Sequence, residues 1–257
     1  MSYVVRSSAG QYKPRVKQGE MQLTVRNVAE FLSVSEKTIY RMIQSGEIPA
    51  YRVHNQFRFN RTELLEWAMA HHINVSPGML QNEETAGEGE APKLSEALRQ
   101  GGIFYRLDSG DKSTALRAMV NVLRLPDDVD RELLFRMHLA RESLASTGIG
   151  DGIAIPHVRN PIILQCPTPQ ITLCFLETPV DFQAVDGNPV FALFSMITPT
   201  IRVHLLLLSR LAFALKNDRL REVIRSQAAK EVIIAEFARM ETPPAPGSAG
   251  AAREATP

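Results

Sequence analysis

The sequence predicts an α/β (α+β) protein with two domains, an N-terminal winged helix-turn-helix and a C-terminal mixed β-sheet covered by helices. Two capped amphipathic helices followed by an alternating segment occupy residues 21–75 and are typical of the first domain. Helical and strand patterns then interleave irregularly over residues 93–240, which indicates a mixed sheet between helices. Residues 76–92 are rich in Gly and Glu, so they predict a flexible acidic linker between the domains.

The two ends of the chain lack a folding pattern. Residues 1–20 contain four Lys or Arg and no hydrophobic period, so we expect a disordered basic arm. Residues 241–257 are rich in Pro, Ala and Gly and are expected to form a disordered tail. The 257 residues, 44% of them hydrophobic, still leave enough chain for two modest cores.

Hydropathy and cysteine usage exclude several classes of protein. No apolar run approaches the length of a membrane span or a signal-peptide core, so we expect a cytoplasmic protein without membrane insertion. Cys166 and Cys174 form neither a disulfide framework nor a C-x-x-C pair, and core or surface thiols are expected. We expect no cofactor and no metal site.

The N-terminal domain begins with two helices joined by a short turn. Thr24 is placed to cap a helix over residues 25–32, whose apolar side chains recur at helical spacing. Ser33-Val34 makes the turn, and Ser35 caps a second helix that ends at Ser45-Gly46. This arrangement predicts a helix-turn-helix.

A wing and a third helix follow. Residues 49–60 alternate between apolar and polar side chains, which predicts a hairpin that turns at His54-Asn55-Gln56. Asn60 is expected to cap the last helix, residues 61–71. The basic side chains lie opposite the apolar ones, which favours DNA binding; the alternative is a protein-interaction fold with a solvated basic face.

The segment from Leu23-Thr24-Val25 to Phe57-Arg58-Phe59 resembles the excisionase-type helix-turn-helix, which is related to the MerR winged fold. The resemblance implies a recognition helix in the major groove and wing residues against the backbone or minor groove. One such module offers little contact area, so modest affinity follows unless a homodimer forms. The implied DNA-binding residues are Lys37, Thr38 and Arg41 on the helix and Arg52 and Arg58 on the wing.

The C-terminal domain is expected to interleave helices and strands. Its predicted strands cover residues 103–107, 152–155, 170–175 and 190–195. Its predicted helices cover residues 94–101, 112–123, 130–143, 203–216, 219–226 and 229–238.

One histidine lies on a turn shaped by glycine and proline. Gly152-Ile153-Ala154-Ile155-Pro156-His157 holds an imidazole at a chain reversal, and we expect His157 to be exposed and oriented. Arg141, Thr147 and the glycine N–H groups near Gly148 are of the types that bind a dianionic phosphate. No acid–hydroxyl–histidine series stands nearby, which argues against a hydrolase.

Five ordered blocks resemble the enzyme IIA domains of the bacterial sugar phosphotransferase system, of the mannitol/fructose type with its nitrogen-related regulatory branch. These blocks are Arg141-Glu142, Thr147-Gly148-Ile149, Gly152-x-Ala154-x-Pro156-His157, Pro179-Val180-Asp181-Phe182 with Val185-Asp186-Gly187, and His204-Leu205 with Leu208-Ser209 and Leu211-Ala212. The resemblance covers residues 93–240.

The resemblance implies that His157 accepts a phosphoryl group from the phosphohistidine of an HPr-like carrier, then passes it to enzyme IIB or keeps it as a regulatory mark. It implies that His204 faces His157, where a core histidine is the alternative. Arg141 is expected to hold the phosphoryl oxygens or to form a structural ion pair. Thr147 is expected to bind phosphate or to cap a turn. His138 matches no family position and is expected to pack in the core.

Two functions follow. The first is a DNA-binding regulator whose phosphorylation reports the state of the phosphotransferase relay. The second is a phosphotransfer intermediate of a sugar transport system, with the helix-turn-helix as a protein-interaction adaptor. The fusion of the two domains favours the regulator, because a transport intermediate needs no helix-turn-helix. Whether the chain acts as a phosphotransferase enzyme stays open at this point.

Overall fold

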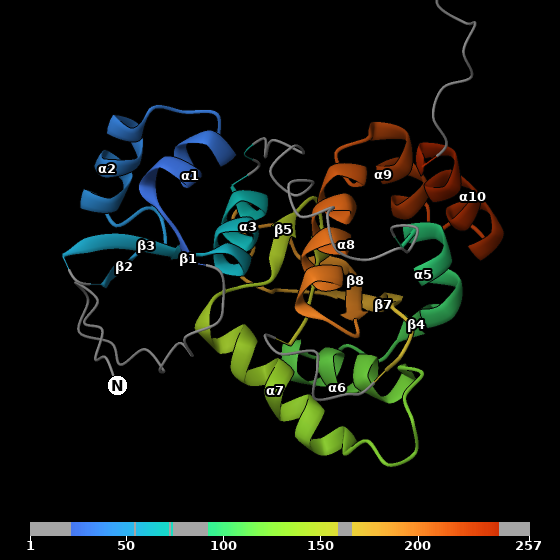
Figure 1. Ribbon diagram of the computed structural model, residues 1–257. Coiled ribbons are helices and arrows are strands. Elements are labelled where there is room, and N and C mark those ends of the chain that lie inside the picture. The colour runs from blue at the N-terminus through green and yellow to red at the C-terminus, as the bar shows by residue number, and fades with distance from the viewer. Residues whose placement is uncertain (1–21, 54, 72, 74–91, 159–165, 242–257) are drawn as a thin grey trace, which may run out of the picture.

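The computed structural model describes residues 22–53, 55–71, 73, 92–158 and 166–241 (Figure 1). The predicted basic arm, residues 76–91 of the predicted linker and residues 242–257 of the predicted tail lie outside these ranges.

The N-terminal module is the predicted winged helix-turn-helix. Helices α1 (Val25–Phe31) and α2 (Glu36–Gln44) precede the hairpin of β2 (Tyr51–Val53) and β3 (Gln56–Asn60), and α3 (Arg61–Ala70) follows. A short strand that the pattern did not predict, β1 (Gln22–Leu23), pairs with β3 and completes an antiparallel sheet of order β1-β3-β2.

Side-chain caps set where these helices begin. Thr24 Oγ1 accepts a hydrogen bond from the Asn27 N–H at 3.2 Å, and Ser35 Oγ accepts one from the Thr38 N–H at 3.2 Å. Asn60 Oδ1 accepts from the Glu63 N–H at 3.1 Å at the start of α3. All three predicted caps are therefore confirmed, because each short polar side chain satisfies an otherwise unpaired N–H.

The C-terminal domain is built on a five-stranded mixed sheet, as predicted. Its strands are β4 (Ile103–Leu107), β5 (Gly148–Gly150), β6 (Ile153–Ala154), β7 (Gln170–Val180) and β8 (Val190–Ile197). Their order is β4-β7-β8-β6-β5, in which β4 is parallel to β7, β6 is parallel to β8, and the other pairs are antiparallel.

Helices cover both faces of this sheet (Figure 1). Helices α6 (Lys112–Val122) and α7 (Arg131–Leu144) lie on one face, and α5 (Leu94–Gly101), α8 (Ile201–Ala214), α9 (Asp218–Arg225) and α10 (Lys230–Glu241) lie on the other. Alternating residues of β7 supply both cores, since Leu173 and Phe175 pack with α5 and α8, whereas Cys174 packs with α6.

Two strand predictions differ from the structure. Strand β7 runs to Val180 instead of residue 175, because its register shifts between Phe175 and Val180 and the exposed Glu177-Thr178-Pro179 run hides the continuation. Residues 148–150, for which no strand was predicted, form strand β5 against β6.

The two domains are in contact. Helix α3 packs beside α8 and β5 (Figure 1), and residues of both domains belong to one hydrophobic cluster. Lys216 Nζ donates a hydrogen bond to the Ile73 carbonyl at 3.4 Å across this contact. Among the described residues, no helix is long and apolar enough to cross a membrane.

Truncation of Phe194 tests the core of the C-terminal domain. Its ring is completely buried and meets Phe237 edge-on with centroids 6.3 Å apart. We expect Phe194→Ala to lower the free energy of unfolding by about 3–5 kcal/mol, measured by urea denaturation. Phe213→Ala is the matched control, because 67% of the Phe213 side chain is exposed. Equal losses for both variants would contradict this core.

Candidate active site

A glycine places the strand that leads to His157. Gly152 has φ +74°, and a Cβ on it would lie 2.5 Å from Phe191 Cδ1. Its carbonyl accepts a hydrogen bond from the Phe191 N–H at 2.8 Å. Only glycine fits both the backbone conformation and the close approach of β8, so the predicted role of Gly152 in shaping this turn is confirmed.

The His157 ring is fixed by a backbone carbonyl. Its Nδ1 lies 2.7 Å from the Ile155 carbonyl oxygen. Because that oxygen can only accept, Nδ1 of the neutral ring holds the hydrogen. Nε2 then bears the ring's lone pair, which is the electron pair that a neutral imidazole uses as a nucleophile.

A second imidazole lies against the first. The His157 and His204 ring centroids are 5.1 Å apart, with the ring planes tilted by 44°. His204 belongs to the first turn of α8, where Thr200 caps the helix by accepting from the Val203 N–H at 3.2 Å. The structure therefore brings these two predicted site residues together at a helix N-terminus, where an anion is stabilised.

The expectation that His157 is exposed is wrong. Both His157 and His204 are only 2% exposed. The physical reason is that the turn follows β6, an inner strand between β8 and β5, and His204 of α8 packs against the His157 ring. The sequence showed the chain reversal but not the elements that cover it.

Arg141 is buried in the last turn of α7, with 5% exposure, and its Nη1 donates to the Ala145 carbonyl at 2.8 Å. This places a guanidinium at the end of the helix that leads into β5. Its role in holding phosphoryl oxygens stays a prediction.

Thr147 belongs to a buried network that the sequence did not reveal. Its hydroxyl donates to Glu142 Oε2 at 2.6 Å, and its N–H donates to the same oxygen at 3.1 Å. Lys112 Nζ lies 3.4 Å from Glu142 Oε1 and donates to the Phe182 carbonyl at 3.0 Å. The donors of Thr147 are thus directed to Glu142, as in the predicted turn cap, and this arrangement does not support the phosphate-binding alternative.

A third histidine lies near the pair. His138 on α7 is 3% exposed, and its Nδ1 lies 3.0 Å from the Leu134 carbonyl. Its Nε2 has no hydrogen-bond partner among the residues that the structure describes. Burial lowers the pKa of His138 to about 4, and its electrostatic interaction with His157 contributes in the same direction. The predicted core location is confirmed, and His138 is electrostatically coupled to His157.

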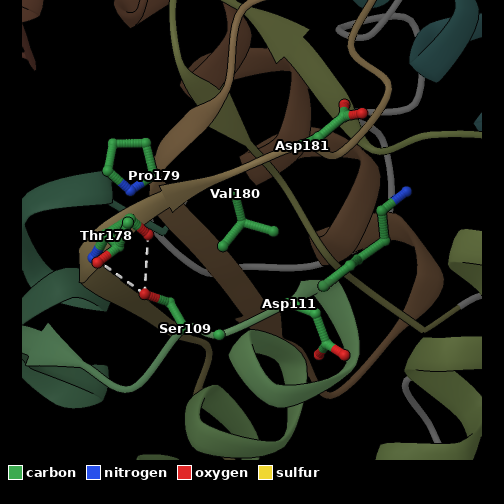
Figure 2. A pocket seen from close by; sticks show the side chains of 8 residues that line it. Ser109, Asp111, Thr178, Pro179, Val180 and Asp181 are labelled. Carbon is green, nitrogen blue, oxygen red and sulfur yellow. Dashed lines mark hydrogen bonds between the residues drawn. The ribbon is translucent and has the colours of Figure 1, made fainter.

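A depression of about 500 Å³ lies elsewhere, lined by Ser109–Lys112 and Thr178–Asp181. Figure 2 shows Ser109 hydrogen-bonded to Thr178 and the carboxylates of Asp111 and Asp181 apart from each other. Lys112 lines the depression together with these two carboxylates, but neither His157 nor His204 does, so the depression is separate from the histidine pair.

The predicted DNA-binding side chains lie on the surface of the N-terminal module. Lys37 and Arg41 are exposed and one turn apart on α2. Thr38 is partly exposed, and its hydroxyl lies 2.9 Å from that of Ser35. Arg52 is exposed and Arg58 partly so, on the two strands of the wing.

Other predicted features can be placed too. Both cysteines are buried, and burial raises the pKa of the Cys174 thiol. The part of the chain that the structure describes contains no group of three His, Cys, Asp or Glu side chains that could hold a metal ion.

The buried His138 predicts a pH dependence of stability. The pKa of His138 is about 4 in the folded chain and 6.5 for a free histidine. Between these two pH values the unfolded chain therefore binds a proton that the folded chain does not bind. The stabilisation is complete above pH 6.5 and lost as the pH falls towards 4, by about 3 kcal/mol. We expect His138→Leu to flatten this part of the stability profile in urea denaturation. Replacing the exposed His71 with Ala is the control, and an unchanged slope in His138→Leu would contradict the assignment.

Comparisons with known proteins identify two families in this chain. The family model "Phosphoenolpyruvate-dependent sugar phosphotransferase system, EIIA 2" matches residues 96–240, and the model "Helix-turn-helix domain" matches residues 23–72. The nitrogen regulatory protein of Pseudomonas aeruginosa is 35% identical over 144 residues, which cover 55% of this chain and 92% of that protein.

A fructose-specific EIIABC component from Bacillus subtilis is 33% identical over 146 residues, 55% of this chain and 22% of that protein. Among solved structures, the nitrogen regulatory protein IIA-Ntr from Neisseria meningitidis is similar with 28% identity and a TM-score of 0.49, over 56% of this chain and 98% of that one. Through residues 96–240, the chain belongs to the EIIA type 2 family of the phosphoenolpyruvate-dependent sugar phosphotransferase system.

Proposed function

We propose that His157 Nε2 accepts a phosphoryl group from the phosphohistidine of an HPr-like carrier, and that the chain couples this state to transcription through its N-terminal module. The observation that supports the acceptor most strongly is the hydrogen bond between His157 Nδ1 and the Ile155 carbonyl, because it leaves the lone pair on Nε2. Because DNA and an HPr-like carrier both occur in the cytoplasm, we propose that the protein acts there.

The transfer step balances without a cofactor. The Nε2–P bond forms as the bond between phosphorus and the donor nitrogen breaks, and that nitrogen keeps the electron pair. Nδ1 keeps its hydrogen, and the Ile155 carbonyl stabilises the positive charge that the ring gains. Donor and product are both phosphohistidines, so the main task of the protein is positioning.

Two groups are proposed to stabilise the transferring phosphoryl oxygens. His204 lies at the N-terminus of α8 with its ring 5.1 Å from that of His157, where it can orient the ring or donate to an oxygen. The buried Arg141 supplies a permanent positive charge at the end of α7.

The N-terminal module is proposed to bind DNA. Its match to a helix-turn-helix model and the exposed Lys37 and Arg41 on α2 support this assignment. Thr38 would lie on the same helix in the major groove, and Arg52 and Arg58 would contact the DNA backbone or minor groove from the wing.

The similarity to a fructose-specific EIIABC component supports a second candidate. In that function the chain passes its phosphoryl group to a cysteine of enzyme IIB in sugar transport, and the N-terminal module is an adaptor for another protein.

Phosphorylation with phosphoenolpyruvate, enzyme I and an HPr-like carrier tests the acceptor. We expect an acid-labile, base-stable phosphate that His157→Ala abolishes. Arg141→Ala and His204→Ala should each slow transfer by roughly 2–4 kcal/mol of barrier without unfolding the domain, which circular dichroism checks. Labelling of His157→Ala at the wild-type level would reject the acceptor. Rates within about twofold of wild type for the other two variants would reject their roles.

Salt-dependent titrations test DNA binding. We expect affinity for DNA upstream of the gene's own operon to fall with rising salt, and Lys37→Ala and Arg41→Ala each to reduce the salt slope by about 1. Lys230→Ala is the control, because Lys230 is exposed at the start of α10. No binding at low salt would favour the adaptor function.

The phosphorylated and unphosphorylated proteins should differ in their affinity for this DNA. Equal affinities would contradict the coupling between phosphorylation and DNA binding, but they would not contradict DNA binding itself.

A further inference from the structure

Helix α3 of the N-terminal module packs on the two elements that border the acceptor site. These elements are β5, which follows α7, and α8, which carries His204 (Figure 1). The apolar residues of both domains belong to one hydrophobic cluster across this contact. Lys216 Nζ also donates a hydrogen bond to the Ile73 carbonyl across the same contact.

Strand β5 is a direct neighbour of the strand that leads to His157. Gly148 pairs with Ala154, and the Ile155 N–H donates to the Thr147 carbonyl at 3.0 Å. His157 follows Ile155 by two residues and contacts His204. Helix α3 thus lies on the immediate surroundings of the acceptor.

A carrier protein needs the same surroundings. A specific protein interface covers about 800 Å² on each partner, which corresponds to a disc with a radius of about 16 Å. The 14 residues of α8 span about 21 Å, and its first turn touches the acceptor ring. The first turn of α8 and strand β5, which pairs with β6, lie within a disc of this size centred on His157, and α3 packs on β5. Because His157 is only 2% exposed, the donor must approach these elements closely.

We propose that the N-terminal module is an intramolecular cover of the carrier-binding face, docked through α3, so that docking and carrier binding exclude each other. This inference rests on the proposed phosphoryl acceptance. Because the two events exclude each other, each weakens the other by the same factor. Carrier binding therefore releases the N-terminal module, and docking slows phosphoryl transfer.

The docked arrangement leaves the DNA-binding face uncovered. In Figure 1, α2 and the β2–β3 wing lie on the side of the module away from the C-terminal sheet, and α3 lies between them and β5. Helix α2, which carries Lys37 and Arg41, and the wing therefore lie away from β5. Phosphorylation therefore affects DNA binding through the release of α3. This release changes the attachment of the N-terminal module to the C-terminal domain and does not cover or uncover the basic residues of the module.

A reducible crosslink tests this inference in the full chain. The variant Ile73→Cys/Lys216→Cys is linked with a disulfide-containing bismaleimide, because the full lysine side chain separates the two backbones and a direct disulfide would not fit. The native Cys166 and Cys174 are buried and should not react. Ile73→Cys/Lys230→Cys is the control pair, since α10 lies far from α3, and it should not link.

We expect the linked protein to accept phosphate from the phosphorylated HPr-like carrier at least about tenfold more slowly than the same protein after reduction of the linker. Failure of the 73/216 pair to link more than the control pair would overturn the docking. Equal transfer rates before and after reduction would overturn the exclusion while leaving phosphoryl acceptance intact. If neither these proteins nor the wild type accepts phosphate, the proposed function fails and the inference with it.

Discussion

The hydrogen bond between His157 Nδ1 and the Ile155 carbonyl is the interaction on which the site depends. It selects the tautomer, orients the ring and leaves the lone pair on Nε2, the nitrogen that we propose as the phosphoryl acceptor. That carbonyl is itself held because the Ile155 N–H bonds to Thr147, and Thr147 bonds to the buried Glu142. The position of the His157 imidazole therefore depends on α7, β5 and β6 together. Loss of the Glu142 network would affect the site by moving this ring.

Local chemistry made much of this protein predictable from its sequence. The caps at Thr24, Ser35 and Asn60 were visible because a short polar side chain before an apolar helical pattern accepts a hydrogen bond from a backbone N–H of the first turn. The segment that carries His157 was visible because Gly152 allows a positive φ and Pro156 fixes its own φ. Each of these signals is contained within a few residues.

Several of the features that the sequence did not reveal involve distant residues. Lys112 meets Glu142 only when α6 packs on α7, and no spacing along the chain encodes this pair. The burial of His157 depends on α8, which begins 44 residues later at Ile201. The contact of α3 with β5 joins segments separated by the whole linker, so neither hydrophobic period nor charge could indicate it.

The burial of the site and the docking of α3 have a common consequence for signalling. In the proposed function, an acceptor histidine that is 2% exposed receives its phosphoryl group only from a partner that binds its surroundings. In the proposed docking, the same surroundings hold the N-terminal module, so carrier specificity and release of the module depend on one contact. In this arrangement, tighter docking of α3 would increase the change that carrier binding causes. Tighter docking would also slow phosphoryl transfer, which limits how tight the contact can be. In the proposed docking, the hydrogen bond from Lys216 to the Ile73 carbonyl breaks each time the module is released and forms again when it docks.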